Sequence, residues 1–203
     1  MWRDHLESRK PSRLQSFLLW GSRGMLAAGV GLLSLVVVVT VQAKLYQVHA
    51  KQLLQSEIRS ASESNIVRPL APLKEGDVLG RLDIPRLGVS VAVLQGTRSR
   101  TLRLGAGHIE GTSLPWEAGN SAIAGHRDTF FRALKDIRPN DEIQLQTVTG
   151  VLHYEVDWTR VVDPDDIRAL APANESVITL VTCYPFYFVG FAPQRFIVRA
   201  HKY

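Results

Sequence analysis

The sequence predicts a mainly β domain preceded by one transmembrane helix, and two observations carry this prediction. Residues 24–43 are twenty consecutive residues without a charge, and a helix rising about 1.5 Å per residue would let them span about 30 Å of hydrocarbon. From Val78 onward the sequence runs in short apolar stretches, many of them alternating or β-branched, separated by Gly and Pro. No long amphipathic helix lies between these stretches, so a barrel or a sandwich is favoured over a βαβ architecture.

The basic residues around the apolar segment predict its orientation. Five Lys and Arg precede it and three follow it within sixteen residues, so the positive-inside rule puts residues 1–23 in the cytoplasm and the chain after Ala43 outside. A cleaved secretory signal is the alternative, because residues 41–43 resemble a cleavage site. Since the apolar core of such a signal is usually only about 7 to 15 residues long, we expect an uncleaved signal anchor in the cytoplasmic membrane.

Residues 44–77 are predicted to form a stalk and a linker. Lys44 to about Ser60 is rich in helix formers and continues the helix, whereas the Ser- and Asn-containing segment that follows, with Pro69 and Pro72, reads as extended.

The formal net charge of +5 comes mostly from the N-terminal part of the chain. Residues 1–77 hold 10 Lys and Arg against 6 Asp and Glu, and residues 78–203 hold 14 against 13. Charge beside a membrane segment suits anionic lipid headgroups better than DNA or RNA. We therefore expect membrane lipid as a partner of residues 24–43 and no nucleic acid.

The remaining chain, residues 78–203, is predicted to be one domain of seven or eight short strands. Seven stretches have strand patterns, namely residues 78–85, 89–96, 121–126, 142–148, 151–162, 176–184 and 195–203. Three short helices are expected at residues 101–104, 130–137 and 164–171. Asp163 is the expected N-cap of the last helix and Pro164 its first residue.

Cys183 is the one cysteine of the chain and ends an apolar run at the edge of a predicted strand. A single thiol in an exported domain is buried and inert, paired with another molecule, or chemically employed. A free cysteine is more often structural than catalytic. At a strand end, however, a thiol can face a cleft on rigid backbone, which makes Cys183 a candidate nucleophile.

A nucleophilic thiol needs a partner that takes its proton, because a free thiol with a pKa of about 8.5 is mostly protonated near neutral pH. His126 and His108 each follow a glycine at the end of a strand-like run. His126 closes the run SAIAGH, whereas His108 lies in a Gly-rich loop. The spacing favours His126, and for either residue a plain hydrogen-bonding role in a turn stays open.

Charge stabilisation of a reacting carbonyl requires a guanidinium or backbone N–H groups. Arg195 begins the last predicted strand, twelve residues after Cys183, so the two could lie on adjacent strands. Arg199 competes with it, because alternation puts both arginines on one face of that strand. An ordinary solvated arginine is the alternative for each.

Three stretches together resemble the sortases, the transpeptidases of bacterial surfaces. They are AGHRDTFF with His126, TLVTC with Cys183, and APQRFIVRA with Arg195, and the family's Thr-Leu-x-Thr-Cys pattern is met in full. The resemblance covers nearly all of residues 78–203. The stretches GHRDTFF and CYPFYFVGFAPQRF are most similar to the class D sortases and the related forms of Gram-negative bacteria.

The resemblance implies an eight-stranded β-barrel at residues 78–203, an N-terminal anchor and an extracytoplasmic catalytic domain. It implies His126 rather than His108, and Arg195 rather than Arg199. Thr182 is implied as a weaker support of the oxyanion. No metal or cofactor is implied.

The activity implied is acyl transfer. Cys183 attacks a sorting signal resembling Leu-Pro-x-Thr-Gly near the C-terminus of a surface protein and forms a thioester. An amine acceptor such as a peptidoglycan peptide then takes the acyl group, which attaches the protein to the cell surface. We expect residues 157–175 to form one wall of the substrate pocket.

Two other functions stay open at this level. One is a different peptidoglycan or peptide hydrolase using Cys and His, although the papain-like order places Cys before His. The other is an anchored module that binds a peptide without reacting.

Overall fold

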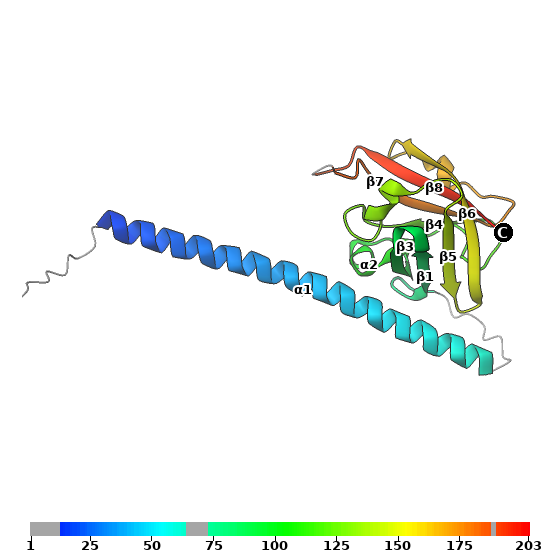
Figure 1. The fold of residues 1–203 in the computed structure, drawn as a ribbon, viewed down its shortest axis with the longest axis horizontal. Helices are drawn as coiled ribbons and strands as arrows, with labels where there is room; N and C mark the ends of the chain where they lie inside the picture. Colours follow the sequence, from blue (N-terminus) through cyan, green and yellow to red (C-terminus); the bar gives the residue numbers. More distant parts are fainter. Residues whose placement is uncertain (1–12, 64–72, 188–189) are drawn as a thin grey trace, which may run out of the picture. The chain divides into compact units, whose positions relative to one another are not determined.

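The computed structural model describes residues 13–63, 73–187 and 190–203 (Figure 1). It divides the chain into two compact units, Met1–Gln42 and Ala43–Tyr203. Residues 1–12 of the predicted cytoplasmic N-terminus and residues 64–72 of the predicted linker lie outside the described residues.

The N-terminal helix α1 (Arg13–Glu63) runs as one helix of 51 residues. Its segment Trp20–Ala50 has a mean hydropathy of 2.4 and is long and apolar enough to cross a membrane. Side chains 20–42 are exposed all round the helix, as a helix that faces lipid requires. The predicted continuation of the helix beyond Lys44 is confirmed, and the helix ends at Glu63, slightly beyond the predicted change near Ser60.

The part of α1 that belongs to the second unit contacts the barrel. The backbone N–H of Ala92 donates to Gln47 Oε1 (2.8 Å). Ala50 is only 2% exposed and packs with Ala92 and Leu94. This end of the helix is therefore part of the packed unit.

Eight strands close into a barrel in the order β1-β2-β3-β4-β7-β8-β6-β5, which confirms the expected eight-stranded barrel (Figure 1). The strands are β1 (Val78–Ile84), β2 (Val89–Gln95), β3 (Ala106–His108), β4 (Asn120–Ala124), β5 (Glu142–Thr147), β6 (Gly150–Val162), β7 (Val177–Tyr184) and β8 (Gln194–Lys202). Strand β2 is parallel to β3 and β4 is parallel to β7. The other neighbours are antiparallel, so the barrel is mixed.

Alternation decides which side chains fill the barrel. In β5, Ile143 and Leu145 are fully buried, whereas Glu142 before them and Gln144 between them are partly exposed. In β7, Ile178 and Leu180 belong to the main core cluster. Thr179, which lies between them, and the alternate residues Val181 and Cys183 therefore point to the outer face.

The strand directions determine which strands begin and which finish at each end of the barrel. Strands β1, β4, β6 and β7 finish at the end where β2, β3, β5 and β8 begin, because this follows from the parallel and antiparallel pairings. We call it the Cys183 end, since β7 reaches it at Cys183 and Tyr184.

A cap segment, residues 126–137, crosses the Cys183 end from β4 to β5 and contains the 3-10 helix η2 (Arg132–Asp136). Phe131, Leu134 and Ile137 of the cap segment are at most 8% exposed and join the main core. Their apolar side chains fill the mouth of the barrel, which water would otherwise enter.

Two local predictions are corrected. Residues 164–171 were expected to be helical from Pro164, but the turn is the 3-10 helix η3 (Ile167–Leu170), capped by Asp166, whose carboxylate accepts from Arg168 N. Asp163 is not the cap, because the helix begins four residues after it; its carbonyl accepts the N–H of Asp166 in a preceding turn. The helix expected at residues 101–104 is confirmed as α2 (Ser99–Leu104).

The second correction concerns His108, which lies on strand β3 and not in a loop. A segment of three residues, with Gly107 inside it and Gly105 before it, gives no alternation signal in the sequence. Backbone pairing with β2 and β4 makes this segment a strand.

We predict that Phe131→Ala lowers the free energy of unfolding by about 3–5 kcal/mol, because it leaves a cavity in the mouth of the barrel. The measurement is urea unfolding of the full chain in detergent, followed by tryptophan fluorescence. Phe130→Ala is the control, since Phe130 is only partly buried at the same cap segment, and its cost should be clearly smaller. Equal costs would show that the cap segment does not close the core.

Candidate active site

Cys183 and Arg195 stand directly opposite each other on β7 and β8. Opposite residues of an antiparallel pair project from the same face, with Cβ atoms about 4.5–5.5 Å apart. Their neighbours on β7 and β8, Thr182 and Phe196, point to the other face, where Thr182 is buried. The thiol and the guanidinium therefore share the outer face of the barrel, and Cys183 is partly exposed there.

His126 reaches the same end of the barrel from the strand on the other side of β7. The parallel register pairs Ala124 with Val181, and the N–H of Gly125 donates to Val181 O (3.0 Å). His126 therefore follows the end of β4, directly after the residue that is hydrogen-bonded to β7. The His126 side chain is exposed.

Thr182 ties these two strand ends together. Its hydroxyl donates to Gly125 O at 2.7 Å, and its side chain is 2% exposed. Thr182, directly before the predicted nucleophile, thus holds Gly125, directly before the predicted base. Its hydroxyl is engaged in that bond on the inner face.

Gly125 leaves room for the cap segment at this point. A Cβ added to it would lie 2.6 Å from the Phe131 ring. The backbone N–H of Phe131 also donates to His126 O (3.0 Å). The backbone of His126 is therefore fixed from both sides, by β7 and by the buried cap segment.

The Arg195 guanidinium is held by its own loop. Its Nη1 donates to the carbonyl oxygens of Ala192 (3.2 Å) and Gln194 (3.0 Å). A guanidinium has five N–H donors. Within residues 13–63, 73–187 and 190–203, the Nε and Nη2 groups have no hydrogen-bond partner, so three donors remain for a carbonyl oxygen.

Arg127 braces the loop between β7 and β8. It donates from Nη1 to Pro185 O (3.0 Å) and from Nη2 to Gly190 O (3.1 Å). The sequence reasoning did not single out Arg127, although it directly follows His126 in the quoted AGHRDTFF stretch. Its position, a positive charge directly after the predicted base, was the signal in the sequence that could have pointed to it.

Three aromatic rings support the strand ends from the inner side. Tyr184 stacks on Phe196 with ring centroids 6.3 Å apart, and Phe186 meets Phe196 edge to face at 5.3 Å. Phe186 and Phe196 also pack against the main core. The backbone that carries Cys183 and Arg195 therefore rests on a rigid base.

His108 is far less suited to proton transfer with Cys183. It is 1% exposed, with Nδ1 3.0 Å from Gln95 Oε1 and Nε2 3.0 Å from Ser113 O. Burial lowers the pKa of His108, so the ring is neutral near pH 7 and contributes stability that is lost as the pH falls below about 6.5. This is a structural histidine of the core.

Arg199, the other predicted arginine, lies on the same face but toward the opposite end of β8. It pairs with Thr179, four residues before Cys183. Thr179 Oγ1 donates to Asn120 Oδ1 (2.7 Å) and accepts from Arg199 Nη1 (3.0 Å). Asn120 Nδ2 in turn donates to the carbonyl oxygens of Ala169 (2.9 Å) and Ala171 (3.0 Å).

This network, Asn120, Thr179 and Arg199, fixes the loop between β6 and β7 onto the outer face of the sheet. The sequence predicted residues 157–175 as a wall, but residues 157–162 belong to β6, and only the loop after them covers this face. In the sequence, Thr179 stands out only as part of the Thr-Leu-x-Thr-Cys motif, and its hydrogen-bond partners cannot be read there. Its partners come from β4 and β8, which no local pattern reveals.

The sortase domain model matches residues 82–203. Sortase D of Bacillus subtilis (strain 168) is 36% identical over 124 residues, which is 61% of this chain and 63% of that protein's own length. The chain thus spans less than two thirds of this curated relative.

Solved structures are similar as well. The Clostridium perfringens Sortase D5 transpeptidase is 28% identical with a TM-score of 0.63, covering 79% of this chain and 97% of that one. Clostridium perfringens sortase C, solved with the C-terminal cell wall sorting motif, is 28% identical with a TM-score of 0.61, covering 78% and 88%.

We predict that Thr179→Val loosens the loop between β6 and β7. The substitution keeps the shape but leaves the buried amide of Asn120 and the guanidinium of Arg199 without their shared hydroxyl, at a cost of about 1–3 kcal/mol in unfolding free energy. Trypsin should also cut faster after Arg168, whose side chain is 89% exposed on this loop. Thr97→Val, at an exposed position, is the control, and unchanged cleavage in Thr179→Val would contradict the role of the network.

Proposed function

The chain belongs to the sortase family, and from this premise we propose that it is a membrane-anchored cysteine transpeptidase with Cys183, His126 and Arg195 as its catalytic residues. The single observation that carries this proposal is the register of β7, which pairs Cys183 with Arg195 on one side and runs parallel on the other to β4, which ends two residues before His126.

The first half-reaction forms a thioester. The Cys183 thiolate attacks a backbone carbonyl carbon of the sorting signal and gives a tetrahedral oxyanion. The C–N bond then breaks, His126 protonates the leaving amine, and the downstream peptide departs. The reactive form therefore carries a thiolate and an imidazolium, and this form need not be the main population of the free enzyme.

The second half-reaction releases the acyl group. An incoming amine attacks the thioester carbonyl, the C–S bond breaks, and His126 takes the proton of the amine. A new amide joins the substrate to the acceptor, and the enzyme returns to its starting state. Water in place of the amine gives hydrolysis.

Arg195 stabilises the oxyanion of both half-reactions. The free N–H groups of its Nε and Nη2 are donors on the face that bears the Cys183 side chain, and fixed donors at a developing charge lower the barrier more than solvent can. Thr182 supports this arrangement from the opposite face, because its hydroxyl bonds Gly125 O (2.7 Å) and so fixes the strand end before His126.

We infer that residues 24–43 are the membrane span of an uncleaved anchor. Their place within the apolar helix Trp20–Ala50 supports this. Residues 1–23 then lie in the cytoplasm, residues 44–77 form stalk and linker, and the catalytic barrel of residues 78–203 lies outside the cytoplasmic membrane.

The proposed substrates are surface proteins with a C-terminal signal resembling Leu-Pro-x-Thr-Gly, and the proposed acceptor is an amine such as that of a peptidoglycan peptide. The solved sortase C with a cell wall sorting motif supports the first of these. The loop between β6 and β7, held on the outer face by Asn120, is the proposed wall for the signal.

We predict that a small library of sorting-signal peptides yields a covalent adduct on Cys183, seen by intact mass spectrometry of the full chain in detergent. Added amine should convert the adduct to a transpeptidation product. Cys183→Ala should abolish both adduct and cleavage. Cleavage that survives this substitution would refute the proposed chemistry, and an adduct released only to water would indicate a hydrolase.

We predict opposite outcomes for the two histidines. His126→Gln should lower the rate of thioester formation by at least about 100-fold and leave the melting temperature nearly unchanged, because the side chain is exposed. His108→Gln should lower the melting temperature and retain most of the rate, because it disturbs buried hydrogen bonds. Activity lost only in His108→Gln would reverse the assignment.

A further inference from the structure

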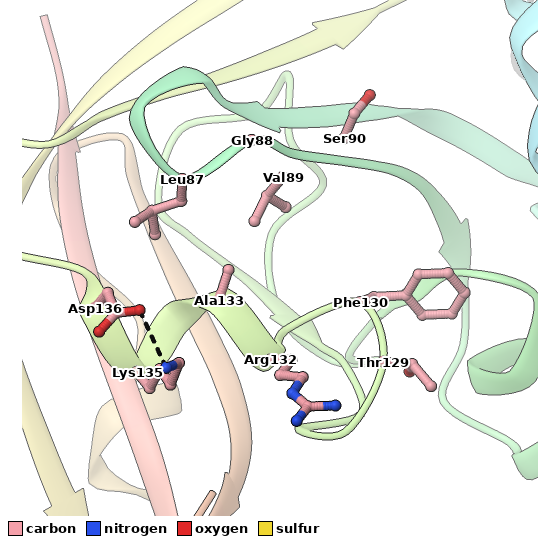
Figure 2. A pocket seen from close by; sticks show the side chains of 10 residues that line it. All are labelled: Leu87, Gly88, Val89, Ser90, Thr129, Phe130, Arg132, Ala133, Lys135 and Asp136. Atoms are coloured by element: carbon pink, nitrogen blue, oxygen red, sulfur yellow. Dashed lines mark ion pairs between the residues drawn. The ribbon is translucent and has the colours of Figure 1, made fainter.

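A hollow of about 460 Å³ lies at the Cys183 end, between the turn that joins β1 to β2 and the cap segment. We call it the rim hollow. Leu87 and Val89 line it on one side and Ala133 on the other, and Figure 2 shows these three side chains directed toward the space between them. The volume falls within the range of small-ligand sites, about 300–1,000 Å³.

The border of the rim hollow is more basic than acidic. Arg132, Lys135 and Asp136 belong to its lining, and Lys135 pairs with Asp136 (3.4 Å) (Figure 2). Within the described residues, no carboxylate pairs with the exposed Arg132. One guanidinium is therefore available to a ligand, and a ligand carboxylate matches it in charge and geometry.

The rim hollow begins close to the proposed base. Thr129, one of its lining residues, donates its N–H to His126 O (3.4 Å). Residues related in this way across a turn have Cα atoms less than about 7 Å apart. A peptide of a few residues bridges the distance between these two backbone positions.

The same segment is connected to the loop that follows Cys183. Lys135 Nζ lies 5.6 Å from the centre of the Tyr187 ring, and Arg127 donates to Pro185 O. The cap segment therefore has the β7–β8 loop on one side and the rim hollow on the other. His126 begins this segment, between the two.

The wall opposite the cap segment is fixed before any ligand binds. Arg86, in the 3-10 turn η1 (Pro85–Leu87), donates to both carboxylate oxygens of Asp141 and to Asp136 O (2.7 Å). The Asp141 side chain is 7% exposed. Hydrogen bonds from Arg86 lower the pKa of Asp141, so the pair stays ionised and holds the turn to the cap segment.

We propose that the rim hollow binds the peptide that carries the acceptor amine. Arg132 pairs with a carboxylate of that peptide, and Leu87, Val89 and Ala133 contact its aliphatic part. This inference rests on the proposed transpeptidation and adds no bond-forming step to it. It names an acidic or C-terminally free peptide amine as the acceptor class.

The position of the hollow fits the acceptor and not the sorting signal. The amine must reach His126, which takes its proton, and the hollow lies on the segment that His126 begins. The signal instead has the outer face of β4, β7 and β8, where the loop held by Asn120 and Arg199 forms a wall. The two substrates of a two-step transfer then have separate places.

The test uses the full chain in detergent, one sorting-signal peptide, and one acceptor peptide prepared with a C-terminal carboxylate and with a C-terminal amide. Arg132→Glu should raise the KM for the carboxylate acceptor about tenfold and abolish the preference for carboxylate over amide. The rate of thioester formation without acceptor should not change. Arg132→Lys should keep most of the preference, because it keeps the charge.

Lys202→Glu is the matched control, because it makes the same charge change at an exposed residue at the opposite end of the barrel. Its acceptor KM should equal that of the unaltered chain. A thioester that forms normally, with equal acceptor KM values in Arg132→Glu and the unaltered chain, would overturn this inference alone. Failure of the unaltered chain to form a thioester would overturn the proposed function and this inference with it.

Discussion

The position of β7 between β4 and β8 is the constraint on which the candidate site depends. Its antiparallel pairing sets Cys183 opposite Arg195, and its parallel pairing brings the end of β4 to the same level. The buried hydrogen bond from Thr182 to Gly125 O fixes the second of these registers where the strands end. A slip of one residue in either pairing would turn the side chains concerned to the other face, so the site exists only in this register.

The alternation of β7 separates two tasks along one strand. Its inward residues, such as Leu180, fill the barrel and supply the burial that stabilises it. Its outward residues carry the polar functions, with Cys183 at one end and the hydroxyl of Thr179 in the network with Asn120 and Arg199 toward the other. Rigid core packing beneath these residues is what allows a thiol and a loop anchor to keep fixed positions on the surface.

The cap segment joins the core to the proposed chemistry. Phe131 lies against Gly125 and closes the mouth of the barrel, while the preceding turn positions His126. The outer side of the same segment forms the rim hollow and contacts Tyr187 beyond Cys183. In the proposed function, the sorting signal and the acceptor therefore approach the site from different sides of the cap segment.

The sequence by itself determined the apolar helix and nearly all strands, because apolar runs and alternation are local patterns. Spacing left two histidines and two arginines open, and the three residues proposed for catalysis follow from the family resemblance of the stretches that contain them. It missed β3, since Ala106 to His108 is a strand only through its neighbours, and it put the cap of η3 at Asp163 where Asp166 serves. Tertiary structure alone decided that His108 is buried in the core, that Arg199 anchors a loop, and that Arg127 braces the loop after Cys183. These roles depend on contacts between residues far apart in the chain, and such contacts leave no trace in the spacing of neighbouring residues.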